Sequence, residues 1–301
     1  MDGVTDPPFR EIVDIYSHPD ILFTEFVSSE AIVRQSKNIL KSLLFHKSKT
    51  LIFAQIFGDN PNLMYKAAVV LSKLNFNGID INMGCPDKTV VHRGAGAALI
   101  NNPKLAQQCI NSVKKAVDEN YQITNKKIMV SVKTRIGFDS IITSSWINAI
   151  LESKPDMITI HGRIAKKIFA GECHWDEIAL AANIAKKYSI PVLGNGSVHT
   201  LQEAKDKINK FRLSGILIGR AALGNPWIFS DKLPSIQEKV KVMKHHCRLF
   251  LKYRPDLQLM PMRKHLAWYC KNFSNSAKIR NLITKVTTLE DLDKILSIIS
   301  E

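Results

Sequence analysis

Short apolar segments alternate with longer amphipathic segments along this chain up to residue 220. The apolar segments have the length of strands and begin near residues 21, 51, 78, 128, 157, 191 and 215. Helical periodicity spans residues 7–16, 29–35, 61–75, 103–120, 143–153, 175–188 and 201–210. This alternation predicts βα units in one parallel sheet with right-handed crossovers. Wholly apolar strands are typical of a sheet that is covered on both faces.

The number of strands favours a barrel. Seven strands are expected, whereas a closed (β/α)8 barrel needs eight, so the missing strand would precede Met1. An open doubly wound sheet is the alternative, but no G-x-G-x-x-G turn follows a first strand here. We therefore predict an α/β fold, a (β/α)8 TIM barrel whose first strand is missing at the N-terminus.

The pattern changes after Pro226 and Trp227, where strand candidates stop. Helical periodicity then runs over residues 235–253, 261–272, 274–285 and 288–299. We predict a barrel domain over residues 1–230 and a C-terminal all-α domain over residues 235–301.

The charge balance points to a polyanionic partner. The formal net charge is +15 and the pI is near 9.6, and residues 231–301 hold 14 Lys and Arg against 7 Asp and Glu. Such a density of positive charge suits nucleic acid. A proteome rich in Lys and Asn would raise the pI without any partner, so charge alone gives nucleic acid a modest advantage.

The cysteines and the hydropathy indicate a cellular compartment. Five scattered cysteines form no C-x-x-C pair, which argues against a disulfide framework or a zinc site and suits a reducing cytosol. No apolar run has the length of a membrane span, and no charged and then apolar leader opens the chain. We expect a cytoplasmic protein with no metal and no membrane partner.

Polar or reactive residues follow six of the seven predicted strands. They are Gln55, Asn82 with Cys85, Lys133 with Arg135, His161 with Arg163, Asn195, and Arg220. Each one alone is explained as well by a surface or core position. In a barrel, however, function gathers at the carboxyl ends of the strands, so together they predict a site there.

The last two strand ends favour a phosphate group. Residues 194–197 and 218–220 are glycine-containing turns, whose backbone N–H groups commonly bind phosphate after the last two strands of a barrel. Arg220 adds a bidentate cation. Lys133 would then be a positive group deeper in the mouth, suited to the electron-rich end of a reduced ring system.

Several motifs, in this order, resemble the tRNA-dihydrouridine synthase family. They are Gly3-Val4-Thr5-Asp6 with Pro8-Phe9-Arg10, Asn82-Met83-Gly84-Cys85-Pro86, Gly94-Ala95-Gly96-Ala97-Ala98-Leu99, Lys133-Thr134-Arg135-Ile136-Gly137, His161-Gly162-Arg163, Gly194-Asn195-Gly196, Gly219-Arg220-Ala221, and residues 262–269 of the helical tail. The resemblance covers nearly the whole chain.

The resemblance implies an FMN-bound barrel that reduces the 5,6 double bond of a uridine in tRNA, with NADPH or NADH as reductant. By matching position, the residues that would hold the flavin are Met1, Gln55, Lys133, His161, Asn195, Gly196, Ser197, Gly219 and Arg220. Cys85 would give the proton to carbon 5 of the uracil, and Asn82, Arg135 and Arg163 would lie near the base. The basic tail would bind tRNA, and we expect a monomer.

Two positions depart from the family pattern. Ser197 stands where relatives often carry an acidic residue. The family's first strand normally ends in an Ala-Pro-Met-like segment that touches the flavin, and this chain opens at Met1, near that motif's Met. A barrel without its first strand exposes two parallel edges, so we expect weakened flavin binding and stability relative to a longer form.

Two other functions stay open from the sequence. One is an FMN barrel that acts on a free pyrimidine. An enzyme with such a small substrate would not need the basic helical tail. The other is a truncated, non-catalytic protein that binds or folds tRNA, although Cys85 and the cofactor positions are retained. The modified uridine, the choice of NADPH or NADH and the oligomeric state are not determined by these motifs.

Overall fold

The structure is a computed structural model that describes residues 1–46, 48–271, 273 and 275–300. Its strands all belong to one sheet, and every paired strand runs parallel to its neighbour. They are β1 (Ile21–Phe23), β2 (Val27–Ser28), β3 (Leu51–Phe57), β4 (Gly78–Met83), β5 (Met129–Arg135), β6 (Met157–His161), β7 (Val192–Asn195) and β8 (Gly215–Leu217).

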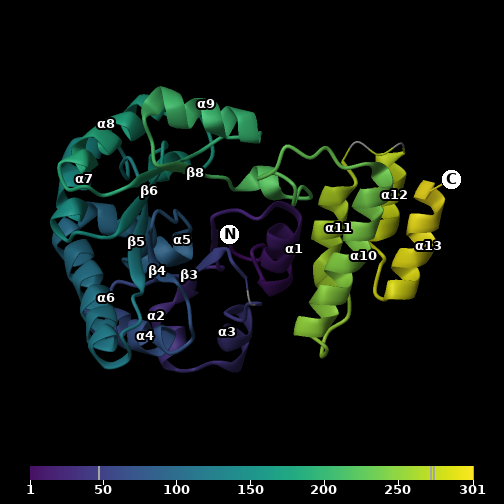
Figure 1. The fold of residues 1–301 in the computed structure, drawn as a ribbon, viewed down its shortest axis with the longest axis horizontal. Coiled ribbons are helices and arrows are strands. Elements are labelled where there is room, and N and C mark those ends of the chain that lie inside the picture. Colours follow the sequence, from purple (N-terminus) through teal and green to yellow (C-terminus); the bar gives the residue numbers. More distant parts are fainter. Residues whose placement is uncertain (47, 272, 274, 301) are drawn as a thin grey trace.

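Helices surround this sheet and then continue as a separate layer (Figure 1). The helices up to α9 are α1 (Pro7–Ser17), α2 (Ser29–Val33), α3 (Lys37–Ser42), α4 (Pro61–Ser72), α5 (Lys88–His92), α6 (Pro103–Thr124), α7 (Thr143–Glu152), α8 (Trp175–Lys186) and α9 (Leu201–Phe211). The later ones are α10 (Ile236–Tyr253), α11 (Arg263–Tyr269), α12 (Ser276–Ile283) and α13 (Leu289–Ser300).

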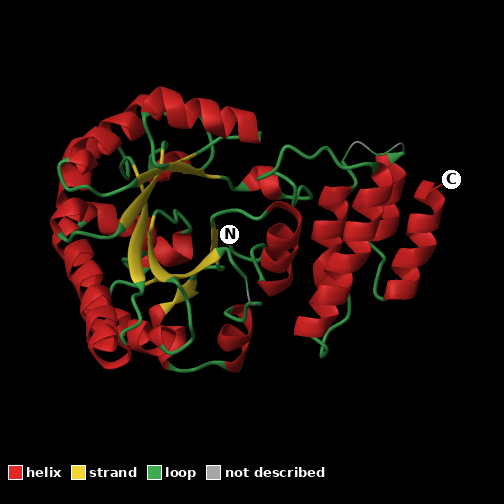
Figure 2. Ribbon diagram, viewed as in Figure 1, coloured by secondary structure: helices red, strands yellow, loops and turns green. Residues whose placement is uncertain are grey.

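The sheet is the curved wall of a barrel, and α4 and α6 to α9 form an arc outside it (Figure 2). The strand order is β1-β3-β4-β5-β6-β7-β8, with β2 also on β3. All six residues of β4 are buried, as expected for a strand covered on both faces. The predicted α/β fold with TIM-barrel-like architecture is confirmed. A strand lies at each of the seven predicted places, the first shorter than predicted, and β2 is an additional short strand.

The two edge strands, β1 and β8, are not paired with each other in the part of the chain that the structure describes. A small apolar cluster instead joins α1 to the segment after β8. It consists of Phe9, Val13, Leu22, Ala222 and Ile228. Side-chain packing therefore takes the place of a hydrogen-bonded ladder between these two edges.

The strand that we predicted near residues 21–26 is broken, for a local reason. The hydroxyl of Thr24 accepts the backbone N–H of Gln55 at 3.0 Å and donates to the carbonyl of Glu25 at 2.8 Å. The side chain thus replaces a backbone carbonyl in the ladder. Regular pairing stops at Phe23 and resumes at Val27.

The tail is helical, as we predicted, and one helix of the barrel packs into it. The buried cluster of α10 to α13 also includes Ile12 from α1 and Trp227. Tyr253 of α10 donates to Glu11 of α1 at 2.7 Å. The division into domains near residues 230–235 stays a prediction, and positions 272, 274 and 301, at the ends of predicted segments, lie outside the described residues.

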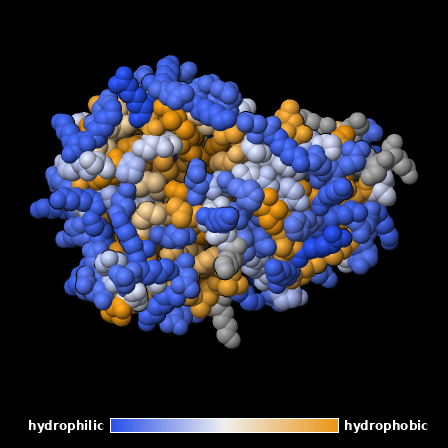
Figure 3. Space-filling model, viewed as in Figure 1, coloured by the Kyte–Doolittle hydropathy of each residue, from blue (hydrophilic) through white to orange (hydrophobic). Residues whose placement is uncertain are grey.

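Surface hydropathy follows this architecture. Hydrophobic side chains show through the middle of the barrel, and mostly hydrophilic residues cover the surrounding helices (Figure 3). No helix within the described residues has both the length and the hydropathy that crossing a bilayer requires.

Buried histidines in the tail predict a dependence of stability on pH. Burial, and then the charge of Lys264, lower the pKa of His265 from 6.5 to about 3. The unfolded chain therefore binds a proton that the folded chain does not, and stability that is present above pH 6.5 is lost as the pH falls. We expect a loss of about 2 kcal/mol from this histidine between pH 7 and pH 5.

Urea titrations at the two pH values measure this loss. His265→Leu should reduce the change in the free energy of unfolding between pH 7 and pH 5 by about this amount, because one of the buried histidines that titrate is gone. His92→Gln, at an exposed position, is the matched control and should keep the wild-type change. Equal changes in both variants would contradict the assignment.

Candidate active site at the carboxyl ends of the strands

The register of the sheet brings the predicted polar residues together at one end of the barrel. Neighbouring positions in the sheet pair Gln55 with Asp80, Asn82 with Lys133, Arg135 with His161, and His161 with Asn195. Because the strands are parallel, their carboxyl ends meet at the same edge. The residues predicted from separate strand ends therefore gather at one edge of the sheet.

Hydrogen bonds hold the turn that carries Cys85. The side-chain oxygen of Asn82 accepts the backbone N–H groups of Gly84 at 3.1 Å and of Cys85 at 2.9 Å. The backbone N–H of Ala97 donates to the carbonyl of Cys85 at 3.0 Å. Gly96 has a φ of +60°, and a Cβ there would lie 2.8 Å from that carbonyl, so only glycine allows this close approach.

The thiol of Cys85 is suited to donating a proton. Burial raises its pKa above the ordinary value of 9.0, and the backbone N–H of Asp87 partly opposes that shift. The thiol is therefore protonated at neutral pH. The positive charges of Arg135 and Lys133 act in the opposite direction to burial and lower the pKa of the thiol.

Two arginines hold the loop that follows β6. Arg135 donates to the carbonyl of Gly84 at 2.7 Å, and also to the carbonyl oxygens of Ile164 and Ile168 at 3.3 and 3.0 Å. Arg163 donates to the carbonyl of Gly171 at 2.9 Å. Arg135 thus ties the Cys85 turn to this loop.

His161 lies among cations and is neutral. Burial, and then the charges of Lys133, Arg135, Arg163 and Arg220, lower its pKa to about 2. Its Nδ1 is buried without a hydrogen-bond partner within the described residues, and so is Nη1 of Arg163. This concentration of positive charge with unpaired donors suits an anionic ligand.

Lys133 is a half-buried cation whose charge interacts with Arg135 and Asp80. Burial, and then Arg135, lower its pKa to about 8, while Asp80 and Cys85 act in the opposite direction. No side-chain hydrogen bond or ion pair of Lys133 occurs among the described residues. A half-buried ammonium group of this kind is costly to keep charged, and an anionic ligand would offset that cost.

The turn after β7 is narrow and partly held by Arg163. Gly196 has a φ of +132°, and a Cβ there would lie 2.5 Å from Sγ of Cys173. Arg163 donates to the hydroxyl of Ser197 at 2.8 Å. Asn195 donates to the carbonyl of Leu217 at 2.8 Å, which joins this turn to the end of β8.

The end of β8 lies beside the N-terminal residue. Sδ of Met1 is 3.7 Å from where a Cβ of Gly219 would be. Arg220 is exposed, and its guanidinium group lies 4.9 Å from the ring centre of Phe169. Met1, Gly219 and Arg220 are thus at the same end of the sheet as the other predicted residues.

A cavity of about 780 Å3 opens beside Cys85 at this end of the sheet. Its wall includes Pro86, Glu25, Ile168 and Phe169. This volume lies in the range of small-molecule sites, and the half-buried thiol faces it.

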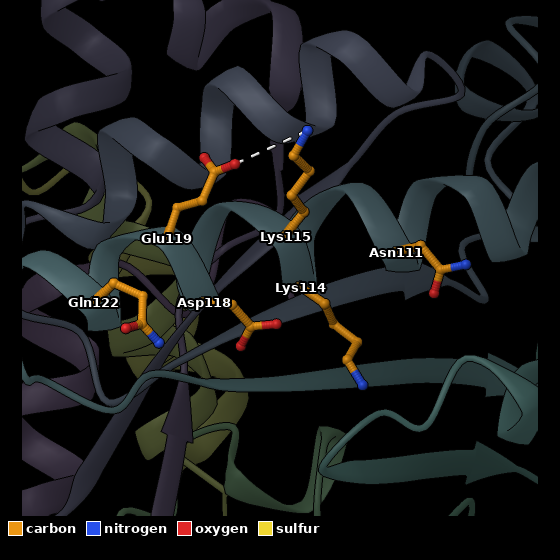
Figure 4. A pocket seen from close by; sticks show the side chains of 6 residues that line it. All are labelled: Asn111, Lys114, Lys115, Asp118, Glu119 and Gln122. Carbon is orange, nitrogen blue, oxygen red and sulfur yellow. Dashed lines mark ion pairs between the residues drawn. The ribbon is translucent and has the colours of Figure 1, made fainter.

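A second hollow, of about 450 Å3, lies elsewhere and does not share this chemistry. Its side chains all come from α6, where Lys115 and Glu119 form an ion pair at 3.9 Å (Figure 4). They are Asn111, Lys114, Lys115, Asp118, Glu119 and Gln122. This hollow is formed by one surface helix and includes no strand end, so it is not the candidate site.

The sequence reasoning missed three residues of the site. Asp80 is fully buried beside Gln55 and could have been found, because it precedes Asn82 by two residues and so points to the same face of β4. Cys173 and Phe169 come from the irregular loop after β6, where no periodicity predicts which side chains reach the site.

Comparison with known proteins identifies relatives of this chain. A model of the dihydrouridine synthase (Dus) family matches residues 1–300. The chain is 28% identical to "Probable tRNA-dihydrouridine synthase 1" of Synechocystis sp., over 97% of this chain and 82% of that protein. It is 31% identical to "Probable tRNA-dihydrouridine synthase" of Rickettsia conorii (94% and 86% covered) and to "tRNA-dihydrouridine synthase B" of Pasteurella multocida (95% and 87% covered).

The fold also matches a solved structure. Morphinone reductase, determined in complex with tetrahydroNAD, superposes with a TM-score of 0.50 at 7% sequence identity, covering 79% of this chain and 86% of that chain. This likeness concerns the barrel fold alone. The family match over residues 1–300 and the 31% identical relatives together lead to one conclusion: the chain belongs to the dihydrouridine synthase family.

Proposed function

We propose that this protein is a tRNA-dihydrouridine synthase, which uses FMN and NADPH to reduce the 5,6 double bond of specific uridines in tRNA. One observation carries the proposal beyond family membership. A protonated thiol, Cys85, faces a cavity at the same strand ends as a neutral histidine surrounded by cations. A proton donor and a site for an anionic cofactor are the two parts that this reduction requires.

The residues present fit FMN. Within the described residues, Nδ1 of His161 and Nη1 of Arg163 have no hydrogen-bond partner, and they and the ammonium group of Lys133 are available to an anionic ligand. The site would be completed by Met1, Gln55, Asn195, Gly196, Ser197, Gly219 and Arg220. FMN held by these residues would supply hydride chemistry between NADPH and carbon 6 of the uracil.

The protein's own contribution is the proton and the placement of the base. Hydride addition at carbon 6 leaves negative charge that a proton at carbon 5 removes, and Cys85 is the acid. The positive charge of Lys133 stabilises negative charge that develops close to it during the reaction. Asn82, Arg135 and Arg163 would act near the base, although Asn82 and Arg135 already bind the backbone of the Cys85 turn.

Two features support tRNA as the substrate. A base inside folded tRNA must be extruded to reach a barrel mouth, and the cavity beside Cys85 has the room for it. Residues 231–301 carry excess positive charge, which suits contacts to phosphates. We also take the protein to act as a monomer in the cytoplasm.

We expect purified protein, supplied with FMN, NADPH and an unmodified tRNA transcript, to form dihydrouridine that mass spectrometry locates at defined positions. NADH in a parallel reaction decides the reductant. Free uracil and uridine are the matched substrates for the alternative function. Reduction of the free pyrimidines without tRNA product would overturn the proposal, and binding of tRNA without any reduction would favour the non-catalytic alternative.

A further inference from the structure

The position of Cys85 depends on a chain of hydrogen bonds that begins at its own backbone. Oδ1 of Asn82 accepts the N–H groups of Gly84 and Cys85. Nδ2 of Asn82 donates to Oε1 of Gln55 at 3.1 Å, and Nε2 of Gln55 donates to Oδ2 of Asp80 at 2.7 Å.

The donors and acceptors in this chain of hydrogen bonds can be arranged in only one order. Backbone N–H groups can only donate, so the oxygen of Asn82 must face them and its NH2 group must face an acceptor. That acceptor is the oxygen of Gln55, whose own NH2 group then also needs an acceptor. Asp80 ends the chain as that acceptor, and its other oxygen, Oδ1, accepts the hydroxyl of Ser131 at 2.5 Å.

Water cannot substitute for any member. Asp80 and Ser131 are 0% exposed, and Gln55 and Asn82 are 5% and 6% exposed. A buried polar group that loses its partner bears the full cost of desolvation. If Asp80 could not accept, the amide of Gln55 would turn, and two NH2 groups would face each other at Asn82.

We propose that Asp80 is a positioning residue for the reaction, which sets the location of the Cys85 thiol through Gln55 and Asn82 by acting as the terminal acceptor. The role of Asp80 rests on the proposed function, because it acts through Cys85. Its carboxylate is also close enough to Lys133 for their charges to interact, so the test must separate the acceptor from the charge.

Two substitutions at Asp80 separate its role as a hydrogen-bond acceptor from the effect of its charge. Asp80→Asn removes the charge but can still present an oxygen to Gln55, because its NH2 group can donate to the hydroxyl of Ser131. Asp80→Leu removes both charge and acceptor. We expect Asp80→Asn to retain most of the tRNA reduction, and Asp80→Leu to lose about tenfold or more in kcat with a smaller change in KM.

A direct readout of thiol position does not depend on tRNA. Alkylation by iodoacetamide, followed by peptide mass spectrometry, gives separate rates for Cys85 and for Cys173, the other half-buried free thiol at this end of the barrel. In Asp80→Leu the Cys85 turn loses the support of Asn82 and keeps that of Arg135 and Ala97. The ratio of the Cys85 rate to the Cys173 rate should therefore rise at least about threefold. General loosening of the fold would raise both rates and leave the ratio unchanged.

Gln55→Glu keeps the size of the side chain and tests the same role if Asp80→Leu does not fold. The new carboxyl group can bond to Asp80 only while one of the two carries a proton, since adjacent buried carboxylates raise each other's pKa. The alkylation ratio should then change with pH between 6 and 9 in this variant and stay flatter in the wild type.

The outcomes distinguish this role from the proposed function. An unchanged ratio in Asp80→Leu, an Asp80→Asn variant as impaired as Asp80→Leu, or a pH-independent ratio in Gln55→Glu would each overturn the positioning role. The acid role of Cys85 is tested separately by its own substitution. A shifted alkylation ratio would uphold the positioning of the thiol even if Cys85→Ala kept full activity on tRNA.

Discussion

Cys85→Ala should abolish the reduction of tRNA while leaving the oxidation of NADPH by the flavin intact. The methyl group cannot protonate carbon 5 of the uracil, and a general acid typically contributes about 10^2 to 10^4 in rate. Hydride uptake from NADPH needs no proton from this thiol. Dihydrouridine formation and NADPH consumption, measured on the same sample, separate the two half-reactions.

Cys109→Ala is the matched control for this experiment. Cys109 is a buried thiol on α6, outside the mouth, so its loss tests only the effect of removing a cysteine. We expect this control to keep both activities. Loss of both activities in Cys85→Ala would count against the acid role, because it would place Cys85 in flavin binding or in folding.

Lys133→Met should change cofactor affinity and stability in opposite directions. The pKa of Lys133 in the folded chain, about 8, lies below its ordinary 10.5. The unfolded chain therefore holds this proton more tightly, and the resulting destabilisation is complete below pH 8 and disappears as the pH rises to 10.5. Removing the ammonium group should raise the free energy of unfolding of the cofactor-free protein by up to about 3 kcal/mol at pH 7.

The same substitution should weaken FMN binding by about tenfold or more, since an anionic ligand loses its charged partner. Asp80 would also lose a neighbouring charge, which offsets part of the gain in stability. Thermal unfolding without cofactor and flavin titration measure the two effects. Lys115→Met is the matched control. The Lys115 side chain is 70% exposed and forms a surface ion pair with Glu119, so its loss should change neither the stability nor the FMN affinity. Lower stability together with unchanged FMN affinity would identify Lys133 as a structural residue.

The barrel was predictable because its signals are local. Strand length, the apolar character of segments such as residues 51–57 and the helices between them follow from periodicity within a short window. The break at Thr24 was not predictable, because it depends on the hydroxyl of Thr24, in place of a backbone carbonyl of the same segment, accepting the N–H of Gln55 on the neighbouring strand. Nothing in the order of residues 21–28 reports which group on β3 they face.

The candidate site also has features that the sequence predicts and features that it does not. Gln55, Asn82, Lys133 and His161 were predicted because each follows or ends an apolar segment, and parallel strands bring such ends together. The hydrogen bonds of Arg135 to the carbonyl oxygens of Ile164 and Ile168 were not predicted, since backbone acceptors carry no residue-specific signal.

The sequence by itself determined the kind of fold and the candidate residues at the strand ends, because hydrophobic periodicity and strand ends are properties of the chain order. Only the tertiary structure decided how those members are used. It placed Asp80 at the end of the chain of hydrogen bonds from Cys85, lowered the pKa of Lys133 beside Arg135, and kept His161 neutral. Directionality and pKa depend on which groups meet away from water, and that is settled only when distant segments pack together.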